Sequence, residues 1–393
     1  MIHDTLSLLQ APLLIFITFL AGLACAVYCL FLLGLSLGLL VLRSPRGHQT
    51  PSFSIVVPAH NEEPVLQETL EALAAQDYAG TFEVLVVDDR SRDTTAEIVR
   101  AFAARDSRFQ LVQVDPSEPD IAAPKKRALQ RGFTQARHEI LASTDADCRP
   151  PRGWITALAS RFLPGVGIVQ GPKGLSGITT LCHRYQECET LALVGAEAAG
   201  FGLGMPFLAS APSLAYRREL FEKVGGFAGM EHLPSGDDDM LVHRMSRLPG
   251  VRVAYCLDPD ASVTTPAADT WHEVLNQRAR WASNGTQYEN KAYVAALSLI
   301  FGFWVFLLLG WILCLSSLLP WPVWIACWIV KTATDAVYFT LSAHRLGRMH
   351  CLAWYPLLAV PQVAICVWAA LAGHFGWYRW KARAEVAQTS RPK

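Results

Sequence analysis

Near its middle the sequence reads His138-Glu139-Ile140-Leu141-Ala142-Ser143-Thr144-Asp145-Ala146-Asp147, an apolar run that leads into two carboxylates. The run predicts a short buried strand with Asp145 and Asp147 at its carboxyl end. Magnesium and manganese take oxygen ligands and usually keep water and substrate phosphate in their other positions. Asp is also common at strand-to-turn junctions for local hydrogen bonding. The pair therefore predicts either a metal site that holds a nucleotide diphosphate or a simple turn.

The segment before this stretch repeats the order of strand, acid and helix. Further strands are expected at residues 53–58, 82–87 and 109–112, and helices at 61–76 and 128–136. Asp88 and Asp89 follow the second strand directly. Such alternation predicts an α/β fold with a mostly parallel sheet, whose ligands bind beyond the carboxyl ends of the strands. Both acidic pairs fall at that edge, which favours the metal site over the turn.

The overall composition excludes some classes of partner. The chain has 393 residues with 34 basic and 34 acidic side chains, so its formal net charge is zero. This balance gives no electrostatic case for binding nucleic acid. The ten cysteines show no metal-ligand spacing, and several lie in apolar runs. Buried reduced thiols are therefore expected rather than disulfides or a zinc site.

Apolar segments on both sides of the α/β segment predict an integral membrane protein that crosses the bilayer several times. Residues 11–42 are longer than the roughly 20 residues that cross a bilayer and longer than a signal-peptide core, so a retained anchor is expected. Arg43 and Arg46 follow it, which places the next domain in the cytoplasm. In a bacterium, this would be the inner or plasma membrane. Three trailing spans are expected at residues 294–319, 323–341 and 352–371.

The side of the membrane on which the tail lies is left open by these spans. Four spans would place residues 377–393 outside, yet this tail is basic and should lie inside. Either the segment around Pro361 is re-entrant, or the tail escapes the rule. Lys331 and Asp335 lie four residues apart inside an expected span, where charges are costly and usually paired. An internal ion pair is favoured for them over a proton-transfer or lipid-phosphate role.

Six short motifs follow one another along the chain. They are residues 54–63 (SIVVPAHNEE), 87–94 (VDDRSRDT), Asp145-Ala146-Asp147, Gly225-Gly226-Phe227, residues 236–239 (GDDD) and residues 277–281 (QRARW). The chain thereby resembles membrane-anchored family 2 glycosyltransferases with the GT-A fold. The Gln-x-x-Arg-Trp motif is similar to that of the cellulose, hyaluronan and ceramide-glucosyl transferase branch. The resemblance covers roughly residues 52–285 and implies a GT-A domain with interfacial helices at 52–290. The apolar and basic segments on either side predict an anchor at 1–43, about three transmembrane helices at 291–376 and a basic tail at 377–393.

The resemblance implies a set of donor-binding residues. Asp88 or Asp89 would accept a hydrogen bond from the nucleotide base, commonly uracil, which makes a UDP-sugar the expected donor. Ala59 and Glu62 would line the same pocket. Lys125 would face the nucleotide or its diphosphate, although Pro124 stands where the family usually has glycine. An exposed basic start of a helix is an equally good interpretation of Lys125 and the two cations after it.

The resemblance also implies the residues that carry out the transfer. Asp145 and Asp147 would bind Mg²⁺ or Mn²⁺ and so neutralise the leaving diphosphate. Asp238 would be the general base that takes the proton of the acceptor hydroxyl, in a single displacement that inverts the anomeric centre. Asp237 is its rival for this role. An acidic cap on the following helix is the alternative for Asp238 and the better interpretation of Asp239.

Three residues of a later amphipathic helix are expected to share one face. Gln277, Arg280 and Trp281 have the spacing i, i+3, i+4. Arg280 could pair with phosphate oxygens, and Trp281 could form the floor of the acceptor subsite. The alternative is a helix at the membrane surface, where Trp and Arg are common.

The acceptor is not identified by the sequence. Residues 210–218 (SAPSLAYRR) depart from the family's Ser-Gly-x-Asn pattern, so acceptor identity does not carry over. Three trailing spans are few for the export of a polymer, which favours a lipid acceptor over a growing glycan. A processive polysaccharide synthase is the first alternative. A membrane subunit that binds nucleotide sugar without catalysis is the second.

Overall fold

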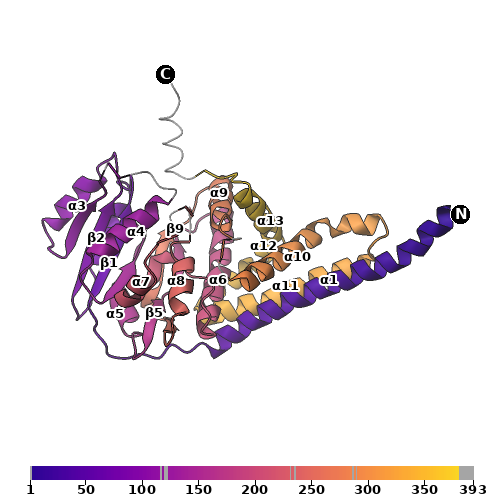
Figure 1. Cartoon of the computed structure of the whole chain (residues 1–393), viewed down its shortest axis with the longest axis horizontal. Coiled ribbons are helices and arrows are strands. Elements are labelled where there is room, and N and C mark those ends of the chain that lie inside the picture. Colours follow the sequence, from indigo (N-terminus) through magenta and orange to yellow (C-terminus); the bar gives the residue numbers. More distant parts are fainter. Residues whose placement is uncertain are drawn as a thin grey trace, which may run out of the picture. The chain divides into compact units, whose positions relative to one another are not determined.

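The computed structural model describes residues 2–115, 117–118, 123–230, 232–233, 236–285, 287–288 and 290–379. Two compact units are present (Figure 1). Unit 1 combines Met1–Leu37 with Asp269–Lys393, and unit 2 is the continuous segment Gly38–Ala268.

Unit 2 is built on a seven-stranded sheet in the order β3-β2-β1-β4-β7-β5-β8. Its strands are β1 (Phe53–Ala59), β2 (Phe82–Asp88), β3 (Phe109–Gln113), β4 (Ile140–Ser143), β5 (Val166–Gln170), β7 (Leu214–Arg217) and β8 (Arg252–Tyr255). The four strands from β3 to β4 are parallel, and β7 is antiparallel to both of its neighbours. A separate parallel pair joins β6 (Lys173–Ser176) to β9 (Val263–Pro266). The expected mostly parallel sheet is confirmed.

Helices cover both faces of this sheet, because alternate side chains of each strand point to opposite faces. The helical segments of unit 2 are α2 (Leu66–Ala74), α3 (Thr95–Ala103), α4 (Pro124–Gln135), α5 (Trp154–Ala159), α6 (Leu181–Gly202), η1 (Ala211–Ser213), α7 (Arg218–Lys223), α8 (Asp239–Ser246) and η2 (Pro259–Ala261). Phe53, Ile55 and Val57 of β1 belong to the core that α2, α3 and α5 complete. Figure 1 shows α3, α4 and α7 beside the labelled strands of this unit.

The face of the sheet opposite this core packs closely against α4. A Cβ on Gly132 would lie 2.4 Å from Cγ1 of Val56 and 3.0 Å from Cγ2 of Val87. Phe133 packs edge-on against Phe221 of α7, with ring centroids 5.1 Å apart. Gly132 thus lets α4 lie directly on β1 and β2.

Two helices begin elsewhere than the sequence pattern predicts. The helix expected from residue 61 begins at Leu66, because Asn61 adopts a positive φ of 55° and ends the strand in a turn. This turn is tied to the next strand-end loop. The Asn61 N–H donates to Ser91 Oγ at 2.9 Å, and Asn61 Oδ1 accepts the Arg92 N–H at 2.8 Å. The helix expected at 128–136 begins earlier, at Pro124, whose fixed φ suits a first helical position.

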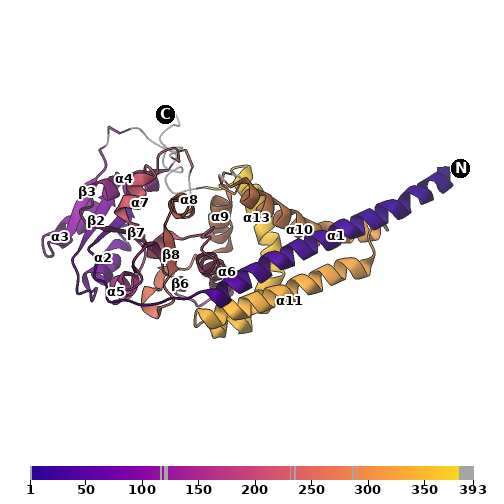
Figure 2. The ribbon, with the colours of Figure 1, turned by 60° about the horizontal axis from the view of Figure 1, so that its bottom comes forward.

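Unit 1 consists of helices. They are α1 (Ile2–Val41, which enters unit 2 at Gly38), α9 (Trp271–Ala282), α10 (Lys291–Leu315), α11 (Trp321–Arg345), η3 (Met349–Trp354), α12 (Tyr355–Ala359) and α13 (Pro361–His374). Figure 2 shows these helices from a second direction. Two segments of the described chain, Ala11–Val41 and Lys291–Leu315, are long and apolar enough to cross a membrane.

The remaining expected spans differ from this pair. Met349–Ala359 and Pro361–His374 would make a third candidate span only together, and they are bent by 69°. The bend falls at Pro361, the position around which a re-entrant segment was expected as one alternative. The helix expected at 323–341 is present as α11, but α11 is not among the segments apolar enough to count as candidate spans.

Inside unit 1, the pairing of Lys331 with Asp335 is confirmed. The Lys331 ammonium lies 2.8 Å from Asp335 Oδ2 and also donates to the carbonyl of Ala359 at 2.9 Å. The hydroxyl of Tyr28 donates to Asp335 Oδ1 at 2.7 Å.

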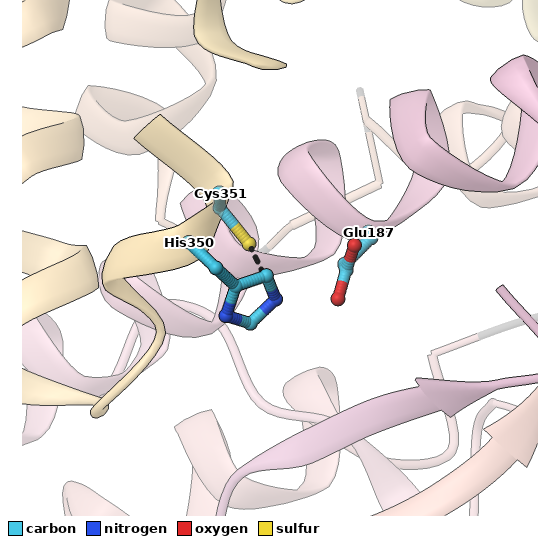
Figure 3. Close-up of side chains that lie close together, drawn as sticks. All are labelled: Glu187, His350 and Cys351. Atoms are coloured by element: carbon cyan, nitrogen blue, oxygen red, sulfur yellow. Dashed lines mark hydrogen bonds between the residues drawn. The ribbon is translucent and has the colours of Figure 1, made fainter. Parts of the chain in front are cut away.

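Eight of the ten cysteines are buried, as expected, and Cys29 and Cys366 are half-buried. All ten are free thiols. On η3, Cys351 Sγ lies 3.5 Å from His350 Nε2 (Figure 3). The structure therefore gives no disulfide among the residues that it describes.

Candidate active site

The carboxyl ends of parallel strands bring the expected acids to one edge of the sheet in unit 2. β1 pairs with both β2 and β4, with Ala59 opposite Asp88 and Val56 opposite Ser143. Asp145 and Asp147 follow β4 directly. Asp237 and Asp238 come from the start of α8. We call Asp145, Asp147, Asp237 and Asp238, together with Lys125, the acid cluster.

Lys125 joins the two halves of the acid cluster. Its ammonium lies 2.7 Å from Asp145 Oδ1 and 3.0 Å from Asp237 Oδ2. Burial alone would lower the pKa of Lys125, but the charges of Asp145, Asp237 and Asp238 raise it. Lys125 is therefore a fixed cation between the Asp-x-Asp motif and the later run of three aspartates.

The two residues after Lys125 are also engaged, so the interpretation as an exposed basic helix start is wrong. Lys126 is 2% exposed, and its ammonium donates to the carbonyls of Met230 and Leu233 at 3.1 and 2.9 Å. Arg127 donates to both oxygens of Asp89 at 2.7 and 2.9 Å. Three consecutive residues at the start of α4 thus have three separate sets of partners.

The two acids of the Asp-x-Asp motif fit a hard divalent cation. Ligand atoms of Asp145, Asp147 and Cys148 lie within 4.8 Å of one another. Burial and the charge of Asp145 raise the pKa of Asp147, so a cation bound here would favour the ionised form of Asp147. Burial raises the pKa of the Cys148 thiol well above its usual value, which disfavours its thiolate form. Two carboxylates without a thiolate suit Mg²⁺ or Mn²⁺ better than a soft metal.

Asp88 and Asp89 have different surroundings. Asp88 Oδ1 accepts the N–H of Ser91 at 3.0 Å. Asp89 is held by Arg127, although burial outweighs this cation and raises the pKa of Asp89. Ala59 accepts the N–H of Asp89 at 2.9 Å through its carbonyl. Asp88 is therefore hydrogen-bonded within its own loop, whereas Asp89 is paired with Arg127 of α4.

Glu62 lies in the loop between β1 and α2. Its N–H donates to Thr95 Oγ1 at 2.9 Å, which joins the loop to the start of α3. The position of Glu62 beside Ala59 and the strand ends agrees with the expected lining of a nucleotide pocket, and that role stays a prediction.

Asp237 and Asp238 are neighbours whose pKa values move in opposite directions. Burial would raise the pKa of Asp237, but Lys125 outweighs burial and lowers it. Burial and the charge of Asp237 raise the pKa of Asp238. Asp238 is the N-cap of α8, as the alternative interpretation expected, and its Oδ1 accepts the Asp239 N–H at 2.8 Å. Its Oδ2 accepts the N–H of Ala211 at 3.1 Å.

Gln277, Arg280 and Trp281 lie on α9, which belongs to unit 1. A capping box between Thr270 and Glu273 begins this helix. Arg278 donates to Gln277 Oε1, and its guanidinium carbon lies 4.4 Å from the centre of the Trp281 ring. Arg278 was not among the expected residues, and its place within the motif was the only signal for it.

A family model described as "Glycosyltransferase like family 2" matches residues 51–284, more than half of the chain. The chain belongs to this glycosyltransferase family, and its fold is the α/β GT-A fold.

Two curated relatives cover a similar part of the chain. "Probable glycosyltransferase YdaM" of Bacillus subtilis (strain 168) is 29% identical over 246 residues, which is 61% of this chain and 56% of the relative. An N-acetylglucosaminyltransferase of Rhizobium meliloti (strain 1021) is 32% identical over 245 residues, 59% of this chain and 55% of the relative. The chain spans about half the length of these relatives.

One solved structure resembles nearly the whole chain. It is the mannosyltransferase PcManGT from Pyrobaculum calidifontis, in complex with GDP-Man and Mn²⁺. The TM-score is 0.60 at 21% identity, over 93% of this chain and 99% of that one. At this identity the likeness supports the fold alone.

Proposed function

We propose that the protein is an inverting, metal-dependent glycosyltransferase that moves a sugar from a nucleotide sugar to a lipid acceptor at a membrane. The observation that carries the proposal is the bridge from Asp145 through Lys125 to Asp237. It joins the acids suited to a metal and a diphosphate to the acids suited to proton transfer. A transferase needs both groups within reach of one sugar.

The donor would bind at the sheet edge. Asp145 and Asp147 would hold Mg²⁺ or Mn²⁺, which when bound offsets the charge of the leaving diphosphate. Lys125 would add a second positive charge beside it. Asp88 is the better candidate to accept a hydrogen bond from a nucleotide base, because Asp89 is held by Arg127. Ala59 and Glu62 would line the nucleotide pocket, and a UDP-sugar is the donor that we expect.

Asp238 would activate the acceptor. A general base works best when its pKa lies near the operating pH. Burial and Asp237 raise the pKa of Asp238, whereas Lys125 holds the pKa of Asp237 low. Asp238 would take the proton of the acceptor hydroxyl while that oxygen forms the bond to the anomeric carbon and the bond to the diphosphate breaks. This single displacement inverts the anomeric centre.

We infer the acceptor from the two candidate membrane spans and from α9. Two segments of the described chain are long and apolar enough to cross a membrane, which supports an acceptor presented at its surface. Arg280 would pair with phosphate oxygens, with Gln277 beside it, and Trp281 would support the acceptor. We propose a multi-pass protein with its catalytic domain in the cytoplasm, at the inner membrane if the protein is bacterial.

The base assignment is tested by Asp238→Asn, with Asp239→Asn as a matched control on the next residue. Loss of a general base lowers a rate by about 10² to 10⁴. We expect this loss in Asp238→Asn with donor affinity unchanged, and only a small change in Asp239→Asn. Wild-type turnover by Asp238→Asn would remove this residue from the mechanism. A large loss confined to Asp237→Asn would move the role to Asp237.

The acceptor and donor are tested with the purified protein and a panel of UDP- and GDP-sugars and membrane lipids. Mass spectrometry of the products separates the alternatives. One added sugar supports a lipid acceptor, and a ladder of masses supports a polysaccharide synthase. Donor binding without any product supports a binding subunit.

A further inference from the structure

Glu197 is a carboxylate buried behind the acid cluster, and the transfer mechanism above does not use it. It lies on α6 and is 1% exposed. The hydroxyl of Ser210 donates to its Oε2 at 3.2 Å, and the Lys173 ammonium of β6 lies 4.0 Å from its Oε1. A carboxylate in this setting costs free energy, so its presence calls for an explanation.

Ser210 connects Glu197 to Asp238. The peptide group between Ser210 and Ala211 is planar, so its carbonyl and its N–H are oriented together. Gln170, which is fully buried, donates from Nε2 to the Ser210 carbonyl at 3.0 Å. The N–H of Ala211 donates to Asp238 Oδ2 at 3.1 Å. The orientation of Ser210 therefore sets one of the two backbone hydrogen bonds that hold Asp238.

We propose that Glu197 is a positioning residue for glycosyl transfer, acting on the Asp238 carboxylate through Ser210 and the peptide group that joins Ser210 to Ala211. The inference rests on the proposed role of Asp238 as the base. In this role Glu197 acts through other groups and does not need to contact substrate or metal. It fixes the Ser210 hydroxyl by accepting its hydrogen bond, and its charge faces Asp238.

Titration of Glu197 adds a pH dependence to this arrangement. Burial raises the pKa of Glu197 to about 7, against the attraction of Lys173 and the hydrogen bond from Ser210, and the charge of Asp238 raises it further. These are the charged and polar groups that face it, while Asp238 also faces Asp237, Lys125 and Lys173. When Glu197 loses its proton, its negative charge increases the proton affinity of Asp238. A stronger base abstracts the acceptor proton faster.

The test measures kcat and KM for donor and acceptor between pH 5.5 and 9. For wild type we expect a rise in kcat of roughly threefold to tenfold centred near pH 7. In Glu197→Gln, which keeps an oxygen acceptor for Ser210 but removes the charge, this rise should disappear while the donor KM stays the same. Glu197→Asp should keep the rise. The matched control is Glu189→Gln, which changes an equally buried glutamate of α6 and should retain the wild-type profile.

A second measurement is independent of turnover. Because the folded state raises the pKa of Glu197 above its unfolded value of 4.5, it favours the protonated form. The stability that this form provides is complete below pH 4.5 and is lost as pH rises through about 7. The unfolding temperature of wild type should therefore fall relative to Glu197→Gln between pH 5 and 8.

The outcomes separate the two proposals. Wild-type transfer with the same pH profile in both Glu197→Gln and Glu197→Leu, which also removes the acceptor for Ser210, overturns the positioning role alone. A change confined to the donor KM also overturns it, because that would place Glu197 in donor binding. Absence of transfer by wild type with every donor overturns the proposed function, and the positioning role with it.

Discussion

The acid cluster of unit 2 and the ion pair of unit 1 both place a lysine against aspartate, but they differ in the number of carboxylates around the lysine. Lys331 meets one carboxylate, and the pair is completed by the Ala359 carbonyl and the Tyr28 hydroxyl. Lys125 instead meets Asp145 and Asp237, with Asp147 and Asp238 close enough to respond to the same charges. A balanced pair in an apolar setting supports structure, whereas an excess of carboxylates can take up a cation or a proton.

The largest effect should come from neutralising Asp145 and Asp147, the two proposed metal ligands of the acid cluster. Asp145→Asn with Asp147→Asn keeps the volume of both side chains but removes two charges. We expect metal-dependent binding of nucleotide to be lost and transfer to fall by about 10³ or more, since such clamps stabilise the leaving diphosphate. Calorimetric titration of nucleotide with and without Mn²⁺ measures this directly. Binding that remains metal-dependent would show that the cation is held elsewhere.

The balanced pair should respond to a single change and tolerate a double one. Lys331→Met leaves Asp335 as a buried charge without its cation, which typically costs about 3–5 kcal/mol. Replacing both partners with apolar residues, as in Lys331→Met with Asp335→Leu, should recover most of this loss. The unfolding temperature in detergent measures both variants. If the double variant is as unstable as the single one, Lys331 and Asp335 contribute more to stability than the neutralisation of each other's charge.

Two neighbouring lysines at the start of α4 allow a sharper comparison. Lys126→Met leaves the carbonyls of Met230 and Leu233 without this donor, and we expect a loss of about 1–3 kcal/mol in stability. Lys125→Met should change the chemistry more than the stability. Lys125 lowers the pKa of Asp238, the proposed base, as well as that of Asp237, so without this cation the acid limb of the transfer profile should move to higher pH. Equal effects of the two variants on stability and on the pH profile would contradict the distinction.

The smallest effect is expected for Tyr355→Phe, one of two changes that each remove a hydroxyl from unit 1. Tyr28→Phe removes a hydrogen bond to a charged acceptor, for which about 1.5–3 kcal/mol is typical. Tyr355→Phe removes one to the Thr332 carbonyl, at 2.8 Å, for which about 1 kcal/mol is typical. Thermal unfolding of the two variants side by side should show the larger shift for Tyr28→Phe. The reverse order would mean that Asp335 is held mainly by Lys331.

The sheet and its acidic edge could be predicted from the sequence because their signals are local. Apolar runs mark the strands, and the acids that follow each run must meet once the strands are parallel. The partners of Lys126 could not be predicted, because the Met230 and Leu233 carbonyls lie about a hundred residues further along the chain. Glu197 sits in an alanine-rich helix, and its link to Asp238 depends on three separate elements.

The division into units also lay beyond sequence reasoning. Residues 52–290 were expected to form one domain, and the family model ends close to that limit. In the structure α9 belongs to unit 1, where a Cβ on Gly373 of α13 would lie 2.6 Å from the Ala279 carbonyl. Such close helix packing depends on which small residues face each other, and no pattern along α9 reveals its partner.

The positions of the charged groups in the acid cluster depend on Gly132, a residue that carries no charge. A methyl group there would meet Val56 and Val87 and push α4 off the sheet. Lys125, Lys126 and Arg127 all project from the first turn of that helix, so a shift of the helix would change the reach of all three cations at once. The spacing between α4 and strands β1 and β2 therefore determines where all three cations lie. We expect Gly132→Ala to alter nucleotide affinity, although this substitution changes no polar atom.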